Sequence, residues 1–457
     1  MNATSTARVK VEPGGTGVVA HVGLHALGAF ADGVGLADVL SARVPVAGER
    51  LPVHDRGKVL VQAALMLAGG GEACADIEEL RAQPELFGSV PSDSTLKRVL
   101  CDELTPSVRA TLMEGIGEAR ARVWEQAGLT ASTDPVYLDI DSTLVEIHSE
   151  NKENAAPTYK GGYGFHPMLC FADATGEALS GLLRPGNAAA NTAADHIAVL
   201  DLALAQLPEA VRAGHRPGDD AEVATRPIVV RTDAAGSTQA FVAAMGERNI
   251  NFMTVAATNA DIQAAIFDAE GVEGLWQPAR RQNGEVREGS AVAELTSLVD
   301  LSAWPAGTRL IVRREPLHPG AQRSLFPSLE YRYFGFYTDC EGDPVELDVT
   351  MRAHAHVEQH IERLKDSGLT RFPFASFEAN AAWMTLVLLA ADLVRWFQLL
   401  CLDGSWATAR PKALRWGIFH APGRLIRSAR RLVVRILEGW PAAHALLGAY
   451  RHIQALT

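Results

Sequence analysis

Residues 136–146 read VYLDIDSTLVE, and this stretch decides how the rest of the chain is interpreted. Aliphatic and aromatic residues dominate its first half, which predicts a strand over 136–141. Because successive side chains of a strand point to opposite faces, Asp139 and Asp141 share one face and the apolar residues occupy the other. Two like charges on a mostly apolar strand are costly unless a cation or hydrogen bonds meet them. The stretch therefore predicts a charged site at the end of a buried strand.

The segments after this strand predict a mixed α/β sheet. Strands are expected at 163–172 and 178–184, and the short turn between them makes this pair antiparallel. The chain then alternates between helices at 193–206 and 237–245 and strands at 228–231 and 251–255. An antiparallel meander followed by helical crossovers is the order of the RNase H-like fold. We therefore predict an α/β fold with an RNase H-like core, in which the first three strands of a mixed sheet are antiparallel.

Length and composition divide the chain into five regions. A chain of 457 residues is too long for one compact core, so several domains are expected. Helical patterns predict an N-terminal helical domain over 1–130, and the core is expected over 131–256 and 347–402. Residues 257–346 predict a separate β-rich insertion, with strands at 290–298, 308–314, 331–338 and 345–348. The last region, 403–457, is expected to be basic and helical.

The most apolar stretch, 384–402, predicts a buried helix rather than a membrane span. It carries Asp392 and Arg395, and each of these charges would cost about 2.5–3.5 kcal/mol at the centre of a bilayer. The sequence does not open with the basic and then apolar pattern of a secretory signal, which favours the cytoplasm. The five cysteines are far apart and show no metal-finger spacing, so free thiols are expected.

Positive charge is concentrated near the C-terminus, although the net charge is −12. Residues 405–437 contain eight Arg or Lys and no Asp or Glu. A local basic patch can hold phosphate groups, because screening confines its field to about 10 Å; the alternative is the solvated face of an ordinary helix. A second basic site is expected at 92–100, where Ser92 caps a helix with Lys97 and Arg98 near its start. That helix suits a DNA groove and a helical bundle equally well.

Two further acids complete a candidate metal site with the strand at 136–141. Asp233 follows the apolar strand at 228–231, and Glu358 lies on a helix expected over 353–365. Lys365 follows Glu358 by two turns on the same helix face. Three carboxylates from two strand ends and one helix are what two-metal phosphoryl transfer needs. Each acid taken alone is more ordinary as a surface residue.

Two other interpretations compete with this one. DIDST at 139–143 also matches DxDxT, the first motif of haloacid dehalogenase-type phosphatases. That family needs a later acidic pair after another apolar strand, whereas Asp219 and Asp220 lie in a loop before one, and its parallel core has no place for an antiparallel meander. His356 and His360 have the i, i+4 spacing of zinc ligands, but no glutamate completes an HExxH motif.

Five stretches share a pattern with a known family. They are DIDST at 139–143, KGGYGFHPMLCFAD at 160–173, LLRPGNAAAN at 182–191, VVRTDAAGS at 229–237 and HAHVEQHIERLKDSGLTRFPFASFEANAAW at 354–383. On these stretches the chain resembles the DDE transposases of bacterial insertion sequences, in the cut-and-paste branch with a β-strand insertion domain. The resemblance runs from about Lys58 to the C-terminus. It implies a metal-dependent polynucleotidyl transferase and endonuclease that cleaves DNA at the ends of a mobile element and transfers the strand.

The resemblance implies a triad of catalytic and metal-binding residues, Asp141, Asp233 and Glu358. Asp141 is followed by a small residue and then Thr, as the first acid of the family typically is, and Asp139 remains the alternative for this position. Lys365 stands seven residues after the glutamate, where relatives place a lysine that contacts the transposon end. The implied cofactor is a pair of Mg²⁺ ions, for which Mn²⁺ is expected to substitute.

The partners implied by the resemblance are double-stranded DNA, at terminal inverted repeats and at the target, and a second copy of the chain in a homodimer assembled on DNA. The domain over 1–130 is expected to bind the element ends. DNA contacts are expected from seven basic residues: Lys365, Lys97, Arg98, Arg424, Arg427, Arg430 and Arg431. The protein is expected in the bacterial cytoplasm, at the nucleoid when it acts, without a membrane partner. A DNA-binding protein with an inactive site and a structure-specific nuclease on the same fold remain alternatives.

Overall fold

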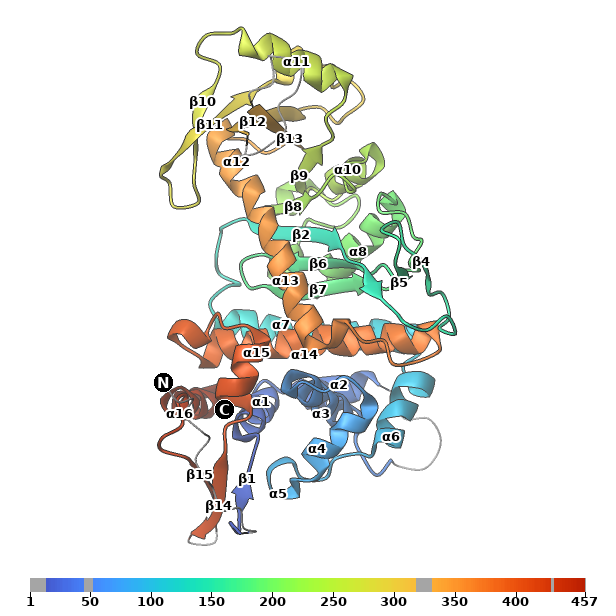
Figure 1. Cartoon of the computed structure of the whole chain (residues 1–457), viewed down its shortest axis with the longest axis vertical. Coiled ribbons are helices and arrows are strands. Elements are labelled where there is room, and N and C mark those ends of the chain that lie inside the picture. The colour runs from blue at the N-terminus through green and yellow to red at the C-terminus, as the bar shows by residue number, and fades with distance from the viewer. Residues whose placement is uncertain (1–13, 45–51, 318–330, 429–430, 457) are drawn as a thin grey trace, which may run out of the picture.

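The computed structural model describes residues 14–44, 52–317, 331–428 and 431–456. Within these residues the chain builds an elongated molecule, in which a large mixed sheet lies above a group of helices in the view of Figure 1. The predicted α/β class and the mixed sheet are confirmed.

Nine strands form one sheet in the order β10-β11-β12-β13-β9-β8-β2-β6-β7. At its centre β2 (Val136–Ser142) pairs parallel with β8 (Ile228–Thr232), and β8 pairs parallel with β9 (Asn251–Ala256). On the other side, β2 pairs antiparallel with β6 (Met168–Ala172) and β6 pairs antiparallel with β7 (Glu177–Leu182). The remaining strands run antiparallel from β9 outward: β13 (Tyr331–Thr338), β12 (Arg309–Pro316), β11 (Val286–Glu294) and β10 (Gln277–Arg280).

The prediction of a separate β-rich insertion is corrected by this topology. Its strands continue the core sheet, because β13 pairs directly with β9. The strand expected at 345–348 is part of a helix, α12 (Pro344–Arg352). In the chain, α11 (Ala260–Glu270) follows β9, the strands β10 to β13 come next, and α12 follows β13. The reason is local: the Asp343 carboxylate accepts hydrogen bonds from the first backbone N–H groups of α12, and a proline at the first helical position suits a helix start.

Helices cover both faces of the central strands. On one face, α8 (Ala193–Gln206) packs against β2, and α10 (Gln239–Gly246) packs against α8 and β9; both helices share a buried cluster with Leu138 and Ile140. On the other face, α12 leads through a single helical turn into α13 (His356–Leu364), and this bent helix crosses the sheet in front of β2 (Figure 1). The acids of β2 therefore lie on the face that α13 crosses.

The predicted strand over 163–172 is divided into two. β5 (Tyr163–Phe165) ends before Pro167, and β6 begins after it. Proline lacks a backbone N–H and interrupts a hydrogen-bonded ladder. β5 instead joins a small three-stranded sheet with β3 (Val145–Glu146) and β4 (Ala156–Pro157) beside the end of β2.

The N-terminal region is helical as far as the structure describes it. Its helices are α1 (Val22–Gly33), α2 (Leu36–Arg43), α3 (Arg56–Gly69), α4 (Glu78–Arg81), α5 (Pro84–Phe87), α6 (Asp93–Arg98) and α7 (Pro106–Gln126). α1, α3 and α7 pack against α14 (Phe377–Cys401), which lies between most of these helices and the sheet. In length and composition α14 could cross a membrane, yet 78% of its most apolar window is buried in the protein. A buried helix was the prediction for this segment.

A charged network buried between α7, β7 and α14 fixes the helical region to the sheet. The Arg120 side chain is completely buried and donates hydrogen bonds to Glu177 and Asp392. The indole N–H groups of Trp124 and Trp396 donate to the same glutamate. Asp392 is tolerated in so apolar a helix because it has hydrogen-bond partners inside the protein, the Arg120 guanidinium and the Ala178 amide.

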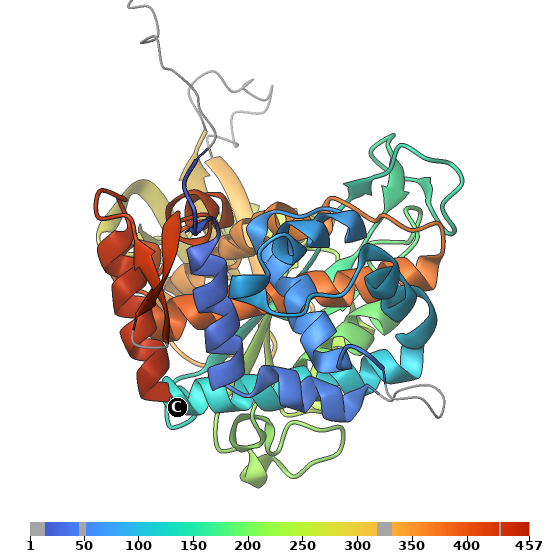
Figure 2. The ribbon, with the colours of Figure 1, turned by 90° about the horizontal axis from the view of Figure 1, so that it is seen from below.

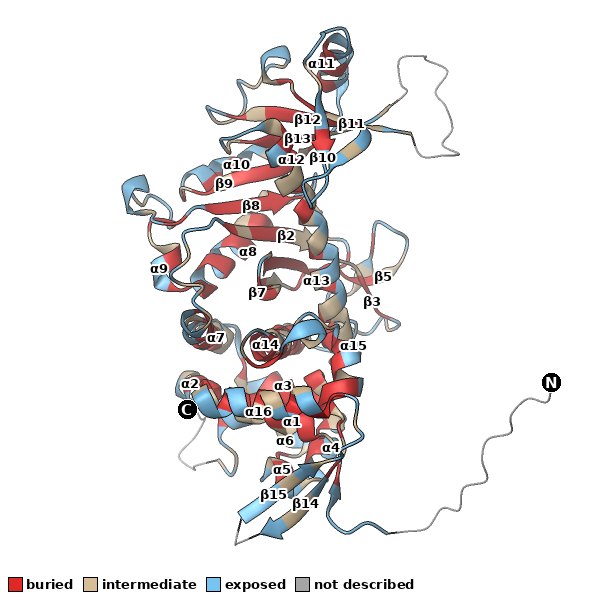
Figure 3. Cartoon of the chain, turned by 90° about the vertical axis from the view of Figure 1, so that its left-hand side faces the viewer, coloured by how far each residue is buried: buried red, intermediate tan, exposed pale blue. Residues whose placement is uncertain are grey.

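The C-terminal region differs from the helical prediction. β14 (Gly423–Ser428) and β15 (Arg431–Ile436) form a hairpin that pairs with β1 (Val18–Val19), and only then does α16 (Ala443–Leu456) follow, packed beside α1 (Figure 2). A short helix, α15 (Pro411–Leu414), precedes the hairpin. The hairpin is largely exposed (Figure 3). Its aliphatic and β-branched residues form cross-strand pairs such as Ile426–Val433, which favour a strand over a helix.

Candidate active site

Three carboxylates from different elements converge where β2 and β8 end. Asp141 is the sixth residue of β2, Asp233 follows β8 directly, and Glu358 lies in the first turn of α13. The last paired residues of the two parallel strands are Ile140 and Thr232, so the next residue on each strand brings Asp141 and Asp233 to the same edge. α13 contacts β2, and the charge of its Glu358 acts on Asp141.

The electrostatics of Asp141 show that these acids influence one another. Burial, the charge of Asp233 and the charge of Glu358 together raise the pKa of Asp141 to about 6, against a hydrogen bond from the Ser142 amide and a nearby His354 that lower it. Within the described residues, the Asp233 carboxylate accepts a hydrogen bond only from the Ala235 amide. No Lys or Arg of the described chain forms an ion pair with any of the three acids. Like charges gathered without a protein cation are a favourable setting for a bound cation.

Asp139 has a different environment from Asp141. It is completely buried, and its two oxygens accept hydrogen bonds of 2.8 and 2.7 Å from the guanidinium of Arg231, its partner residue on β8. His354 lies 2.7 Å from the same carboxylate. The charge of Asp139 is therefore balanced inside the protein.

The ion pair extends to a third acid on the same face. Arg231 also contacts Asp173 at 2.7 Å, in the turn after β6. Burial opposes ionisation of Asp173, but contacts with His360, Arg231 and His356 outweigh it and hold the pKa of Asp173 below its usual range. His356 Nδ1 and His360 Nε2 lie 2.9 and 3.8 Å from the same Asp173 oxygen, so both histidines of the i, i+4 pair face one carboxylate.

A metal site can be tested on the oxygen donors at this edge. Within the described residues, no three His, Cys, Asp or Glu side chains lie close enough to enclose a single metal ion. Mg²⁺ does not need such an enclosure, since it is usually held by one or two carboxylates and completes its shell with waters and substrate oxygens. The three acids supply only oxygen donors, carry no competing ion pair and repel one another, so Asp141, Asp233 and Glu358 are the residues that would hold Mg²⁺.

The acidic pair required by the phosphatase interpretation lies elsewhere. Asp219 and Asp220 come before β8, so they lie toward the end of that strand opposite Asp233. The Asp219 carboxylate accepts the Arg216 amide, and Asp220 caps a short helical turn. Both acids thus have local structural roles.

The basic residues expected at DNA occupy three separate places. Lys365, directly after α13, forms a 3.0 Å ion pair with Glu362. Lys97 and Arg98 end the short helix α6, and Arg98 contacts Glu103 at 3.7 Å. The exposed arginines of the hairpin are Arg424, Arg427, Arg431 and Arg435, and Arg430 lies outside the described residues.

Two arginines have roles that the sequence did not indicate. Arg231 neutralises the acids beside the site, and its only signal is a charge inside the apolar run Ile228–Thr232. Arg415 was counted with the basic patch, but its guanidinium donates to the backbone carbonyls of Leu67 and Ala68 at the end of α3. It stabilises a helix end and is not free for phosphate.

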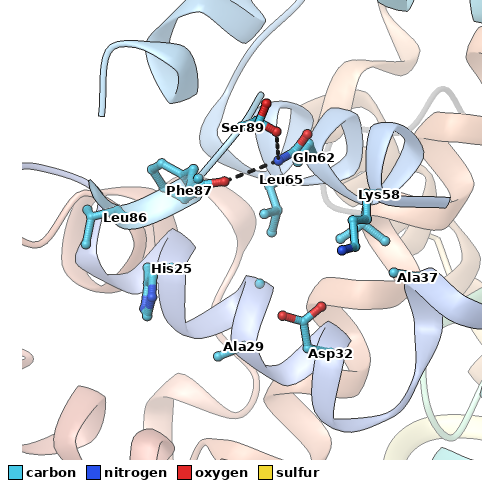
Figure 4. Close-up of a pocket in the computed structure, with 13 residues that line it drawn as sticks. His25, Ala29, Asp32, Ala37, Lys58, Gln62, Leu65, Leu86, Phe87 and Ser89 are labelled. Atoms are coloured by element: carbon cyan, nitrogen blue, oxygen red, sulfur yellow. Dashed lines mark hydrogen bonds between the residues drawn. The ribbon is translucent and has the colours of Figure 1, made fainter. Parts of the chain in front are cut away.

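A separate cavity of about 360 Å³ lies among α1, α3 and α5 (Figure 4). Asp32 and Lys58 face it, and the Gln62 amide donates to the backbone carbonyls of Phe87 and Ser89 on its rim. None of the three converging acids lines this cavity. The carboxylate cluster, and not the cavity, is therefore the candidate for chemistry.

Comparison with known proteins identifies the family of the chain. Among curated proteins none matches the sequence. The chain is similar to a solved structure described as the cryo-EM structure of piggyBac transposase synaptic complex with hairpin DNA, at 11% sequence identity and a TM-score of 0.38, over 87% of this chain and 80% of that chain. The family model described as transposase DDE domain group 1 matches residues 1–457, the whole chain. With its converging acids at the ends of β2 and β8, the chain belongs to this family of DDE transposases.

Proposed function

We propose that the protein cleaves DNA at the ends of a bacterial mobile element and joins the freed strand to a target, with Asp141, Asp233 and Glu358 as its catalytic acids. The observation that carries this proposal is their convergence without a protein cation. Burial, together with the charges of Asp233 and Glu358, raises the pKa of Asp141 to about 6. Bound Mg²⁺ would activate the attacking oxygen and stabilise the leaving oxygen of a phosphodiester. Mn²⁺ is expected to replace it.

The chain itself contributes the position of the three acids. Asp141 and Asp233 are fixed by adjacent parallel strands, and their carboxylates accept amide hydrogen bonds from Ser142 and Ala235. We assign the first catalytic position to Asp141 rather than Asp139, because the carboxylate of Asp139 is already occupied by Arg231. The order of three antiparallel strands followed by parallel β8 and β9 supports an RNase H-like core for this site.

Double-stranded DNA is the proposed partner, with the helical N-terminal region at the element ends and a homodimer formed on DNA. Lys365 follows Glu358 by seven residues, about two helical turns. Once its ion pair with Glu362 is broken, its side chain can reach a phosphate of a strand bound at the acids. The exposed arginines of the β14–β15 hairpin form no ion pair within the described residues and can hold further phosphates.

The test is a cleavage and strand-transfer assay with DNA that carries the inverted repeats flanking the gene. Wild-type chain should cut and join in Mg²⁺, whereas Asp141→Asn, Asp233→Asn and Glu358→Gln should each lose about 10³-fold or more in rate. Asp139→Asn should retain measurable joining if its role is structural. Joining at wild-type rates by any of the first three variants would remove that residue from the site. Cutting without joining would indicate a nuclease, and binding without cutting an inactive site.

A further inference from the structure

A short loop beside the carboxylates presents an aromatic ring to solvent. β4 and β5 pair antiparallel, with Pro157 opposite Tyr163, and residues 158–162 connect them. Tyr159 at the tip of this loop is 70% exposed. The Nζ atom of Lys160 lies 5.6 Å from the centre of the Tyr159 ring, and Lys160 has no acidic partner among the described residues. An exposed ring and an unpaired cation are thus displayed together.

Backbone hydrogen bonds hold the loop in one conformation. The Thr158 amide donates to the Gly162 carbonyl at 2.8 Å, and the Gly161 amide donates back to the Thr158 carbonyl at 3.0 Å. The Gly162 amide also donates to the Thr158 hydroxyl at 3.1 Å. Gly161 has a φ of +84°, which an L side chain rarely adopts, and the turn depends on it. Because the loop is already ordered, little entropy is lost when a ligand meets the ring.

A chain of contacts connects the ring to the first acid. The centres of the Tyr159 and His166 rings are 5.8 Å apart. His166 Nε2 lies 2.9 Å from the Ser142 hydroxyl, and the Ser142 amide donates to Asp141 at 2.7 Å. His166 is buried, whereas Tyr159 extends from it into solvent. A strand whose phosphate lies at Asp141 would therefore run close to the Tyr159 ring.

An exposed aromatic ring beside a cation is the chemistry that recognises an unpaired nucleobase. A base offers a flat face for stacking, and the neighbouring phosphate offers a partner for lysine. We propose that Tyr159 stacks against an unpaired base next to the phosphate at Asp141, and that Lys160 binds a phosphate of the same strand. This positioning role rests on the proposed function, since it requires DNA at the three acids.

The test uses DNA with an unpaired 2-aminopurine next to the expected cut, bound to the full chain in a chelator so that no cleavage occurs. A 2-aminopurine base is dim when stacked and bright when free. Wild-type protein and Tyr159→Phe should leave it dim, whereas Tyr159→Ala should leave it unstacked and bright. In Mg²⁺, cleavage by Tyr159→Ala should fall about 5- to 150-fold, the effect of losing one stacked base. Phe267→Ala removes another exposed ring, 68% exposed on α11, and should change neither signal.

The outcomes separate this inference from the proposed function. Unchanged emission together with wild-type cleavage by Tyr159→Ala would overturn the stacking role while leaving the three acids untouched. Cleavage by Asp141→Asn at the wild-type rate would overturn the proposed function, and the emission experiment would still decide whether the ring holds a base. Lys160→Gln should lower the salt dependence of DNA binding by about one phosphate contact, and no change would remove Lys160 from the proposal.

Discussion

Asp139 and Arg231 lie opposite each other on the parallel strands β2 and β8, and two hydrogen bonds of 2.8 and 2.7 Å join their side chains inside the protein. Immediately beyond the next residue pair, Asp141 and Asp233 carry like charges with no protein cation between them. The same two strands therefore hold a neutralised pair and a repelling pair. The attraction between Asp139 and Arg231 stabilises the pairing of the two strands next to the point where Asp141 and Asp233 repel each other.

Removal of Arg231 should be strongly destabilising. Arg231→Met leaves Asp139 buried without its partner, and breaking one side of a buried ion pair costs about 3–5 kcal/mol in the free energy of unfolding. The double variant Asp139→Asn with Arg231→Met removes both charges and should recover part of that loss. Urea unfolding of the three proteins checks this. Equal stability of the single and double variants would show that the pair is not the source of the effect.

Mg²⁺ should stabilise the folded chain through the three acids. A ligand that binds only the folded state adds about 1.4 kcal/mol when its concentration is ten times its dissociation constant. Thermal unfolding with and without Mg²⁺ should show this gain for wild type and a smaller one for Asp141→Asn or Glu358→Gln. Asp219→Asn is the matched control, because this acid lies before β8 and caps a loop. If Asp219→Asn lost the stabilisation by Mg²⁺ while the other variants kept it, the metal would be assigned to that loop instead of the three acids.

The buried Asp392 should make the free energy of unfolding decrease as the pH rises. Burial and the charge of Glu177 raise the pKa of Asp392 to about 7, although Arg120 lowers it. Since this value is above the ordinary 3.8, the folded protein holds a proton that the unfolded chain releases, and the free energy of unfolding falls between about pH 4 and 7. The effect should be on the order of 2–4 kcal/mol. Asp392→Asn should flatten this slope in urea unfolding at several pH values, and an unchanged slope would assign it to other groups.

The hairpin arginines should affect DNA binding without sequence preference. Arg424 and Arg435 are a cross-strand pair on exposed strands, so both can contact one phosphate backbone. Replacing both with Gln should reduce the slope of log affinity against log salt by about 2, since each phosphate contact contributes about 0.9. Arg281→Gln, on the turn between β10 and β11, is the control. Equal slopes in all three proteins would exclude the hairpin from the DNA surface.

The sequence predicted the strands around Asp141 well because burial and alternation are local signals. It placed β13 at its observed bounds, and it placed α8 at Ala193–Gln206. The choice between Asp139 and Asp141 could not be made from one strand, because the partner of Asp139 comes from a strand 92 residues later. The assignment of the three acids to catalysis stays a prediction.

The main errors in predicting secondary structure arose where one stretch of sequence fits both the spacing of a helix face and the pattern of a strand. Arg424, Arg427, Arg431 and Arg435 recur every three or four residues, as on one face of a helix. In the structure they lie on two strands, because Leu425 and Val434 pair across the hairpin and pack toward the core. The cap at Asp343 and Pro344 outweighed the alternating pattern of 345–348 in the same way. Pairing across a hairpin is a tertiary fact that a local pattern does not contain.

The pairing of β1 with β14 has a consequence for how the protein is made. Val18 and Val19, near the start of the chain, align with Arg424 and Gly423, more than four hundred residues later. β1 therefore gains this partner strand only after β14, more than four hundred residues later, has been synthesised. A product truncated before the hairpin leaves β1 without this partner strand, so premature termination should yield a molecule that chaperones and proteases recognise as unfinished.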